Sequence, residues 1–421
     1  MQFASTGALD TTTMNLTRFT LLAAVSFTSL VDTLPAFAQE EPDQVVARVK
    51  LSSPSNEENP VFAEAGDILM VLNVKDKVVL VQSAEGRRAN VREQDVVELT
   101  QSKPLYDQLI KETPNNPALY SSRAMVYSIL NDQQQVIADL NMAMRLGSKT
   151  PSVYINRGAA YATLGEYEKA VADYSAAIKA GYDHPSVFVN RAVTYMAQGE
   201  AKKSSDDLTV ALKKDPKNEF ALMQRGIAYQ RQQLWDQAIA DFTTLFEMNE
   251  KNIEAISSRG FTHYLKGDGK NAVADFTTAI KINPESALAY NNRGFNRQTI
   301  GQYKEALADF NKAIELEPKY AMAFQNKAWL LATCPDEKIR DGKLAIEAAT
   351  AAGELREWKV IPDLKSLAAA YAEVGDFKKA VEWQKKVVGM IENEEAKSGE
   401  QELLKLYQNK APFRFAPPPA E

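Results

Sequence analysis

The sequence contains very little cysteine and histidine. Among its 421 residues there are one cysteine, Cys334, and two histidines, His184 and His263. A single thiol cannot form an intramolecular disulfide or supply a cysteine-based zinc site. So few imidazole groups also argue against Ser-His-Asp, Cys-His and histidine-metal sites. The composition therefore predicts a protein that is not an enzyme and that uses no metal or cofactor.

A surplus of positive charge is also missing. The formal net charge is −6, whereas nucleic-acid-binding domains carry a basic patch or stripe. Beyond residue 38, no apolar run reaches the ~20 residues that a membrane-spanning helix needs. The fractions of hydrophobic and charged residues, 45% and 25%, are those of ordinary folded domains. We expect no nucleic-acid partner and no integral membrane segment in the mature protein.

Residues 1–38 have the pattern of a secretory signal peptide. Arg18 precedes an apolar stretch, Phe19–Val31, and the small-aromatic-small sequence that ends at Ala38 is typical of signal-peptidase sites. A transmembrane anchor is the alternative, but the stretch is shorter than a bilayer requires. We therefore expect cleavage after Ala38 and export to the periplasm or out of the cell.

Residues 39–101 predict a small β-module. Short β-rich runs with close turns are typical of small barrels, and they occupy Val45–Val49, Asp67–Val74, Val78–Gln82, Ala89–Val91 and Val96–Leu99. The order AGDILMVLNVKDKVVLVQSAEGRRANVREQDVVEL resembles bacterial SH3-like domains. Asn90 stands where such domains often have tryptophan, and SH3-type grooves need aromatic walls to bind proline-rich peptides. The resemblance thus implies an SH3-like barrel, and the missing aromatic walls favour a structural or weakly interacting role, with peptide binding as the alternative.

Two consecutive 34-residue blocks dominate the middle of the chain, PSVYINRGAAYATLGEYEKAVADYSAAIKAGYDH and PSVFVNRAVTYMAQGEAKKSSDDLTVALKKDPKN. This period is the signature of the tetratricopeptide repeat (TPR), a helix–turn–helix unit. Stacked units bury their apolar faces and form an α-solenoid with a concave surface. We expect a mostly α protein with TPR repeats over residues 102–393. The full repeats begin near Pro117, Pro151, Pro185, Glu219, Ile253, Ala287, Ala321 and Ile361.

Small and large residues alternate at fixed repeat positions. The eighth position is small, at Ala124, Gly158, Ala192, Gly226, Gly260, Gly294 and Ala328. The twenty-fourth position is bulky, at Leu140, Tyr174, Leu208, Phe242, Phe276 and Phe310. Small residues let the two helices of a repeat approach, and large residues then fill the groove between them.

The C-terminal region ends the array. The blocks KAWLLATCPDEKIRDGKLAIEAATAA and SLAAAYAEVGDFKKAVEWQKKVV resemble the closing part of exported bacterial TPR proteins, which implies bacterial origin but no activity. Residues 394–410 predict a capping helix. Residues 411–421 are rich in proline, and we expect them to be disordered.

Two polar rows recur with the repeats. The first pairs an arginine at the seventh position with an aspartate sixteen residues later: Arg123/Asp139, Arg157/Asp173, Arg191/Asp207, Arg225/Asp241, Arg259/Asp275 and Arg293/Asp309. This spacing places the pair on facing helices, where it would fix the helix geometry; ligand binding is the alternative. An exposed pair of this kind would contribute only ~0–1 kcal/mol.

The second row is the sixth position, which holds Asn156, Asn190, Gln224, Ser258, Asn292 and Asn326. The order Asn-Arg-Gly resembles repeats of the TPR superhelix of O-linked N-acetylglucosamine transferase. That resemblance implies asparagines that line the concave face and hold a peptide backbone, because an amide both donates and accepts hydrogen bonds. A solvated inner helix face is the alternative.

The sequence thus predicts a non-catalytic scaffold that binds a protein or peptide in its concave groove. The alternative is a structural subunit of an envelope enzyme or secretion complex that docks through its outer faces. The identity of the partner, the oligomeric state and the start of the chain, at Met1 or Met14, stay open.

Overall fold

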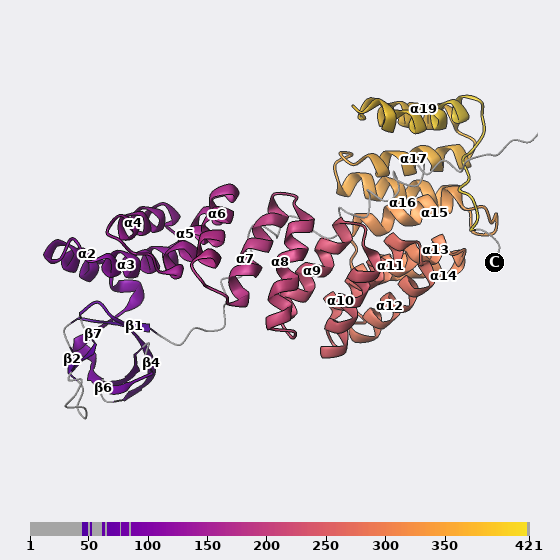
Figure 1. Cartoon of the computed structure of the whole chain (residues 1–421). Coiled ribbons are helices and arrows are strands. Elements are labelled where there is room, and N and C mark those ends of the chain that lie inside the picture. The colour runs from indigo at the N-terminus through magenta and orange to yellow at the C-terminus, as the bar shows by residue number, and fades with distance from the viewer. Residues whose placement is uncertain are drawn as a thin grey trace, which may run out of the picture. The chain divides into compact units, whose positions relative to one another are not determined.

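The computed structural model describes residues 44–48, 51–52, 61–63, 65–75, 77–83 and 86–418. The predicted signal peptide, with its cleavage site after Ala38, lies outside these residues. The described part of the protein is mostly helical and has a small antiparallel sheet near its beginning (Figure 1). It forms two compact units that divide between Ala228 and Tyr229.

The first unit opens with a five-stranded sheet. Its antiparallel strands lie in the order β6-β5-β4-β1-β7. They span Gln44–Ala47 (β1), Ile68–Lys75 (β4), Val78–Gln82 (β5), Arg88–Arg92 (β6) and Val96–Glu98 (β7). These five strands coincide with the five predicted β-rich runs, whereas the separate pair β2 (Leu51–Ser52) and β3 (Val61–Ala63) was not predicted.

The described strands do not close into the barrel that the sequence suggested. β6 and β7 form the two edges of the five-stranded sheet and do not pair with each other. The 3₁₀ turn Glu93–Asp95 (η2) leads directly from β6 to β7, and β7 pairs with β1. An SH3-like barrel is therefore not supported by the strand pairing.

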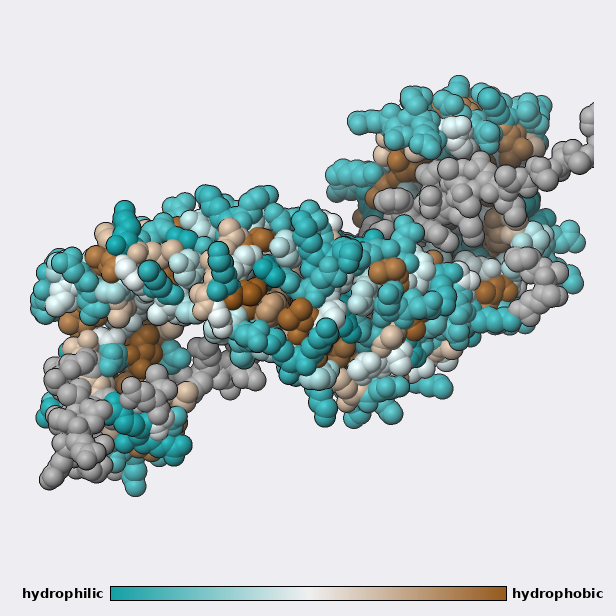
Figure 2. Space-filling view, viewed as in Figure 1, coloured by the Kyte–Doolittle hydropathy of each residue, from teal (hydrophilic) through white to brown (hydrophobic). Residues whose placement is uncertain are grey.

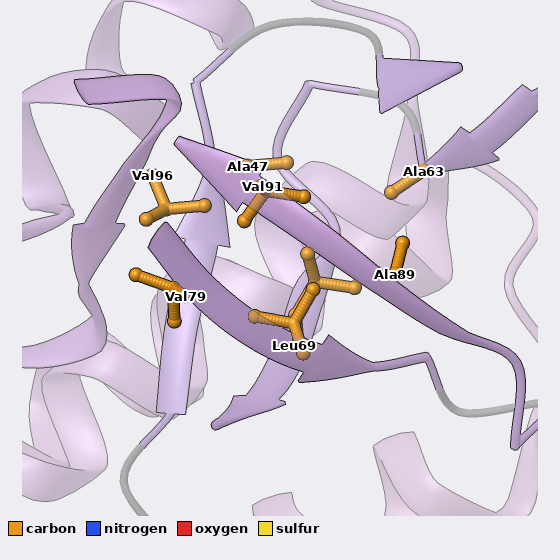
Figure 3. Close-up of a cluster of buried hydrophobic side chains, with 8 residues drawn as sticks. Ala47, Ala63, Leu69, Val79, Ala89, Val91 and Val96 are labelled. Atoms are coloured by element: carbon orange, nitrogen blue, oxygen red, sulfur yellow. The ribbon is translucent and has the colours of Figure 1, made fainter. Parts of the chain in front are cut away.

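Aliphatic side chains form the core of this sheet. Figure 3 shows Leu69, Val79, Val91 and their neighbours pointing toward one another. β6 alternates buried Ala89 and Val91 with exposed residues, so Asn90 faces solvent and no aromatic side chain is needed at its position.

Tyr106 joins the sheet to the first helices. It lies on α2 (Lys103–Glu112), is fully buried, and its hydroxyl donates a hydrogen bond to the Gly66 carbonyl oxygen at 3.0 Å. Burial raises the pKa of this hydroxyl. Val46, Leu99 and Leu119 pack in the same cluster. The sheet is thus docked on the helices that follow it.

Eight helix pairs follow. Their first helices are α3 (Pro117–Ile129), α5 (Pro151–Thr163), α7 (Pro185–Ala197), α9 (Glu219–Arg231), α11 (Ile253–Lys266), α13 (Ala287–Thr299), α15 (Ala321–Thr333) and α17 (Ile361–Glu373). Their second helices are α4 (Gln133–Arg145), α6 (Tyr167–Lys179), α8 (Ala201–Lys214), α10 (Trp235–Met248), α12 (Gly269–Ile282), α14 (Tyr303–Leu316), α16 (Gly342–Leu355) and α18 (Phe377–Gly389). Every first helix begins at the residue where the repeat pattern placed a repeat start. Proline is the first helical residue of α3, α5 and α7, where its missing N–H leaves no helical bond unmade.

Facing residues within a helix pair are matched in size. A Cβ atom added at Gly294 would lie 2.9 Å from the Phe310 ring, and one added at Gly158 would lie 3.0 Å from the Tyr174 ring. Repeats with leucine at the large position instead carry alanine at the small one, as in Ala124/Leu140 and Ala192/Leu208, all buried. Glycine at Gly158 and Gly294 thus makes room for the facing aromatic ring.

The arginine at the seventh position bonds in two directions. Its Nε and Nη2 donate to the aspartate of its own second helix at 2.7 to 2.9 Å, in Arg123/Asp139, Arg157/Asp173, Arg191/Asp207, Arg259/Asp275 and Arg293/Asp309. Its Nη1 donates to a polar residue sixteen positions earlier, on the preceding helix, at 2.6 to 3.4 Å. These acceptors are Asp107, Asn141, Ser175, Thr209 (from Arg225), Thr243 and Thr277. Each such arginine thus connects its own repeat to the one before it.

This geometry favours the structural interpretation of the Arg/Asp row. In the central example, the side chains of Arg191 and Asp207 are 18% and 10% exposed. The hydrogen bond to Asp207 raises the pKa of the Arg191 guanidinium, although burial acts to lower it. The predicted partners Arg225, on α9, and Asp241, on α10, belong to different units, and Asp241 is buried.

The chain ends with a helix and an extended segment. α19 (Glu394–Gln408) packs on α18 and buries Tyr407, at the place predicted for a capping helix. Residues 411–418 are ordered against the repeats: Phe415 N donates to the Thr333 carbonyl oxygen at 3.1 Å. The aromatic side chains between the prolines of this segment, for which the sequence predicted disorder, pack on the helices.

We predict that Gly294→Ala lowers the free energy of unfolding although alanine is the better helix former. The helix gains up to ~1 kcal/mol, but crowding against Phe310 costs about 1–3 kcal/mol. In a double-mutant cycle, Phe310→Leu should remove this crowding, so that the two substitutions together cost less than their sum. Urea unfolding followed by circular dichroism measures all four proteins, and strict additivity would contradict the size matching.

We also predict that Arg191→Ala lowers the free energy of unfolding by about 2 kcal/mol, because it leaves the buried Asp207 carboxylate without its guanidinium. This value lies between those typical of exposed and of buried ion pairs. Lys202→Ala is the matched control, since it removes a pair whose side chains are 77% and 63% exposed. It should change the unfolding midpoint little. Equal midpoints for the two variants would rule out a structural role for the arginine.

Candidate functional site

The amide row of the first unit lies on successive first helices. Asn156 is on α5, Asn190 on α7 and Gln224 on α9. Asn156 is exposed, and the other two are half-buried. Within the part of the protein that the structure describes, these three side chains have no hydrogen-bond partner. Because α5 and α7 contact each other directly, their amides lie on adjoining helices of one face.

In the second unit the same repeat position is used differently. Asn326 is only 7% exposed, and its Nδ2 donates to Asn291 Oδ1 at 2.9 Å. Asn291 in turn donates to Asn292 Oδ1 at 3.3 Å. Asn326, predicted to line an open groove, is therefore buried between two helices. α13 and α15 approach closely enough for the Asn326 amide to hold the two helices together.

Ser258 and Asn292 complete the predicted row in this unit, and both are half-buried. The Ser258 carbonyl oxygen accepts a hydrogen bond from Thr262 Oγ1 at 2.6 Å, within α11. Asn292 is already an acceptor for Asn291. The amides without internal partners are thus those of the first unit, at Asn156, Asn190 and Gln224.

The aspartates of the Arg/Asp row are buried, which favours the structural interpretation over ligand binding. Asp173, Asp275 and Asp309 are 5%, 6% and 3% exposed, and Asp207 and Asp241 are buried as well. The first three accept both of their arginine hydrogen bonds from the facing helix of the same repeat. Because helix packing covers these carboxylates, the estimate for an exposed pair does not apply to them. Their hydrogen bonds join the two helices of a repeat.

An apolar row accompanies the amides and was not predicted from the sequence. It occupies the ninth repeat position, one helical turn beyond the sixth, and so lies on the same face of each helix. Its members are Ala159, Val193, Ile227, Phe261, Phe295 and Trp329, all half-buried. The increase in side-chain size from alanine to tryptophan at this repeat position could have revealed the row from the sequence.

The face that carries the amide and apolar rows can offer a ligand hydrogen bonds and apolar contacts. No set of three or more His, Cys, Asp and Glu side chains among the described residues could hold a metal ion. The side chains of the charged Arg/Asp row are hydrogen-bonded to neighbouring helices. Figure 2 shows a mainly hydrophilic visible surface with hydrophobic residues in small separate patches. None of the helices in the described ranges combines the length and the apolar character that a bilayer span requires.

Comparison with protein families identifies the repeats. Residues 155–219 and residues 287–320 each match a family described as tetratricopeptide repeat. No curated protein matches the sequence.

Several solved structures resemble the fold. YrrB, described as a TPR protein with an unusual peptide-binding site, is 22% identical with a TM-score of 0.41, over 44% of this chain and 95% of its own. A tetratricopeptide repeat protein from Parabacteroides merdae ATCC 43184 is 21% identical with a TM-score of 0.43, over 72% and 99%. MamA AMB-1 is 24% identical with a TM-score of 0.34, over 39% and 96%. The two family matches and the helix pairs described above show that this protein contains tetratricopeptide repeats.

Proposed function

We propose that this protein is a non-catalytic interaction scaffold that binds an extended segment of a partner protein on its first-helix face. One observation carries this proposal: Asn156, Asn190 and Gln224 have no internal partner among the described residues. The neighbouring arginines and aspartates, in contrast, form hydrogen bonds between helices. A row of amides left free in this way is available for an external ligand.

The chemistry of the face suits a polypeptide. A primary amide has donors and an acceptor that can pair with backbone C=O and N–H groups whatever the ligand's side chains are. Val193 and Ile227, one turn away on α7 and α9, offer apolar contacts for those side chains. Because the repeats hold the amides on packed helices, association costs less ordering than it would on a flexible surface.

Docking through the outer faces of the second helices is the competing function, as in a structural subunit of an envelope enzyme or secretion complex. The second helices present charged, exposed residues such as Lys202 and Asp206. We assign the β-module a structural role, because its five-stranded sheet is docked on α2 and α3 and the described residues of its core are aliphatic.

The test of the groove uses affinity capture from envelope extract with the full-length protein as bait. We expect the triple variant Asn156→Ala/Asn190→Ala/Gln224→Ala to lose a partner that the parent retains, with a loss of affinity of at least about tenfold for three removed hydrogen bonds. The matched control is Lys202→Ala/Asp206→Ala on the outer face of α8. Circular dichroism first establishes equal helicity. A partner kept by the triple variant and lost by the control would instead assign binding to the outer face.

We further propose that the protein is exported in a bacterial cell and matures by cleavage after Ala38. The basis is the sequence pattern of residues 1–38 alone. N-terminal sequencing of the protein from the envelope fraction should begin at Gln39. A protein that retains Met1 or Met14 as its first residue, or that stays in the cytoplasmic fraction, would contradict export.

A further inference from the structure

The segment after α19 runs back along the repeats. In Figure 1 the yellow coil leaves α19 and passes α17 and α15 toward α13 and α14. Its contacts follow that path: Arg414 reaches Glu373 at the end of α17, Phe415 reaches Thr333 at the end of α15, and Pro418 reaches Gly301 in the α13–α14 turn. Residues 411–418, here called the tail, therefore cross the ends of three first helices.

The two phenylalanines of the tail use aromatic partners. Phe413 lies against Trp329, with ring centroids 5.7 Å apart, and Trp329 is the last member of the apolar row. Phe415 meets Tyr303 edge-on at 5.7 Å. Such pairs add to the free energy gained from apolar burial. The spacing of Phe413 and Phe415 fits an extended strand whose alternate side chains both face the protein.

Arginine and the backbone supply the polar contacts. Arg414 Nη1 donates to the Ala332 carbonyl oxygen at 3.1 Å, and Phe415 N donates to the Thr333 carbonyl oxygen at 3.1 Å. These carbonyls belong to the last turn of α15, where a helix leaves its C=O groups without internal partners. The negative end of the helix dipole also favours the guanidinium there. Glu373 completes the site by accepting from both Arg340 and Arg414.

From these contacts we propose that the ends of α15 and α17, with Tyr303, form a docking surface for an extended aromatic–arginine–aromatic peptide segment. The tail occupies this surface in cis, and a segment of the same chemistry from a partner protein binds there when the tail detaches. The surface is separate from the amide row at Asn156, Asn190 and Gln224, so either proposal can fail without the other.

The short connection from α19 determines how strongly the tail competes with a partner segment for the docking surface. Only Asn409 and Lys410 separate the helix from the tail. A short link of this kind gives an effective concentration on the order of millimolar. The tail therefore excludes weak ligands, and a partner must bind more tightly or present several segments.

Cys334 reports on the state of the tail. It is the only cysteine of the sequence and is fully buried. Phe415 and Tyr303 pack against the cluster that contains it. Burial raises the pKa of its thiol, which lowers its reactivity. Detachment of the tail should therefore make Cys334 accessible to a thiol reagent.

The experiment measures the rate at which iodoacetamide labels Cys334 in the full-length protein and in Arg414→Glu, which places a carboxylate beside Glu373. We expect severalfold faster labelling of Arg414→Glu, and slower labelling again when a synthetic peptide of residues 411–421 is added. The same peptide with Arg414→Glu should not restore protection. Pro417→Ala is the matched control, because Pro417 belongs to the tail but is exposed.

Two results would overturn the proposal. One is an unchanged labelling rate in Arg414→Glu and in a variant that ends at Lys410, with helicity preserved by circular dichroism. The other is faster labelling that no millimolar concentration of the parent peptide reverses, which would mean that the surface accepts the tail only in cis. If the shortened variant fails to fold, Arg414→Glu and the peptide still decide the outcome.

Discussion

The helix stack depends on the arginine at the seventh repeat position, which the first six repeats carry. Arg191 holds Asp207 of its own second helix and Ser175 of the helix before it. A planar guanidinium has five donors in a fixed fork, so a single arginine satisfies two acceptors on different helices. Within each unit, the bond inside a repeat and the bond to the preceding helix are therefore made by the same side chain.

These arginine bonds determine which polar side chains are left available to a ligand. The aspartates are buried, and their charge is balanced inside the array, so the charged row offers little to a ligand. The amides of Asn156, Asn190 and Gln224 lie next to it in sequence but point to a face where the described residues give them no partner. The structural role and the proposed recognition role thus fall on adjacent positions of the same helix.

The arrangement changes toward the C-terminus. Lys327 stands at the seventh position of α15, and the Arg/Asp row does not continue there. Other ion pairs hold the closing repeats, including Arg356 with the fully buried Asp363 and Lys365 with Glu400. Desolvation raises the pKa of Asp363, whereas the facing Arg356 acts to lower it. The tail then bonds to the end of α15, so the C-terminal repeats are covered by a segment outside the repeat pattern.

The sequence by itself determined the features that repeat at short range. The helix starts, the small and large positions, and the Arg/Asp spacing of sixteen residues all follow from a helix–turn–helix unit whose geometry is local. The tertiary structure decided the features that depend on neighbours. Asn156 and Asn326 hold the same repeat position, yet one is exposed and the other is buried and bonds to Asn291, because the preceding first helix α13 places an amide oxygen within reach of Asn326. The acceptors on the preceding helix vary among aspartate, asparagine, serine and threonine, so composition did not reveal them. The open edges of the sheet and the path of the tail likewise come from contacts between residues far apart in sequence, which no local period encodes.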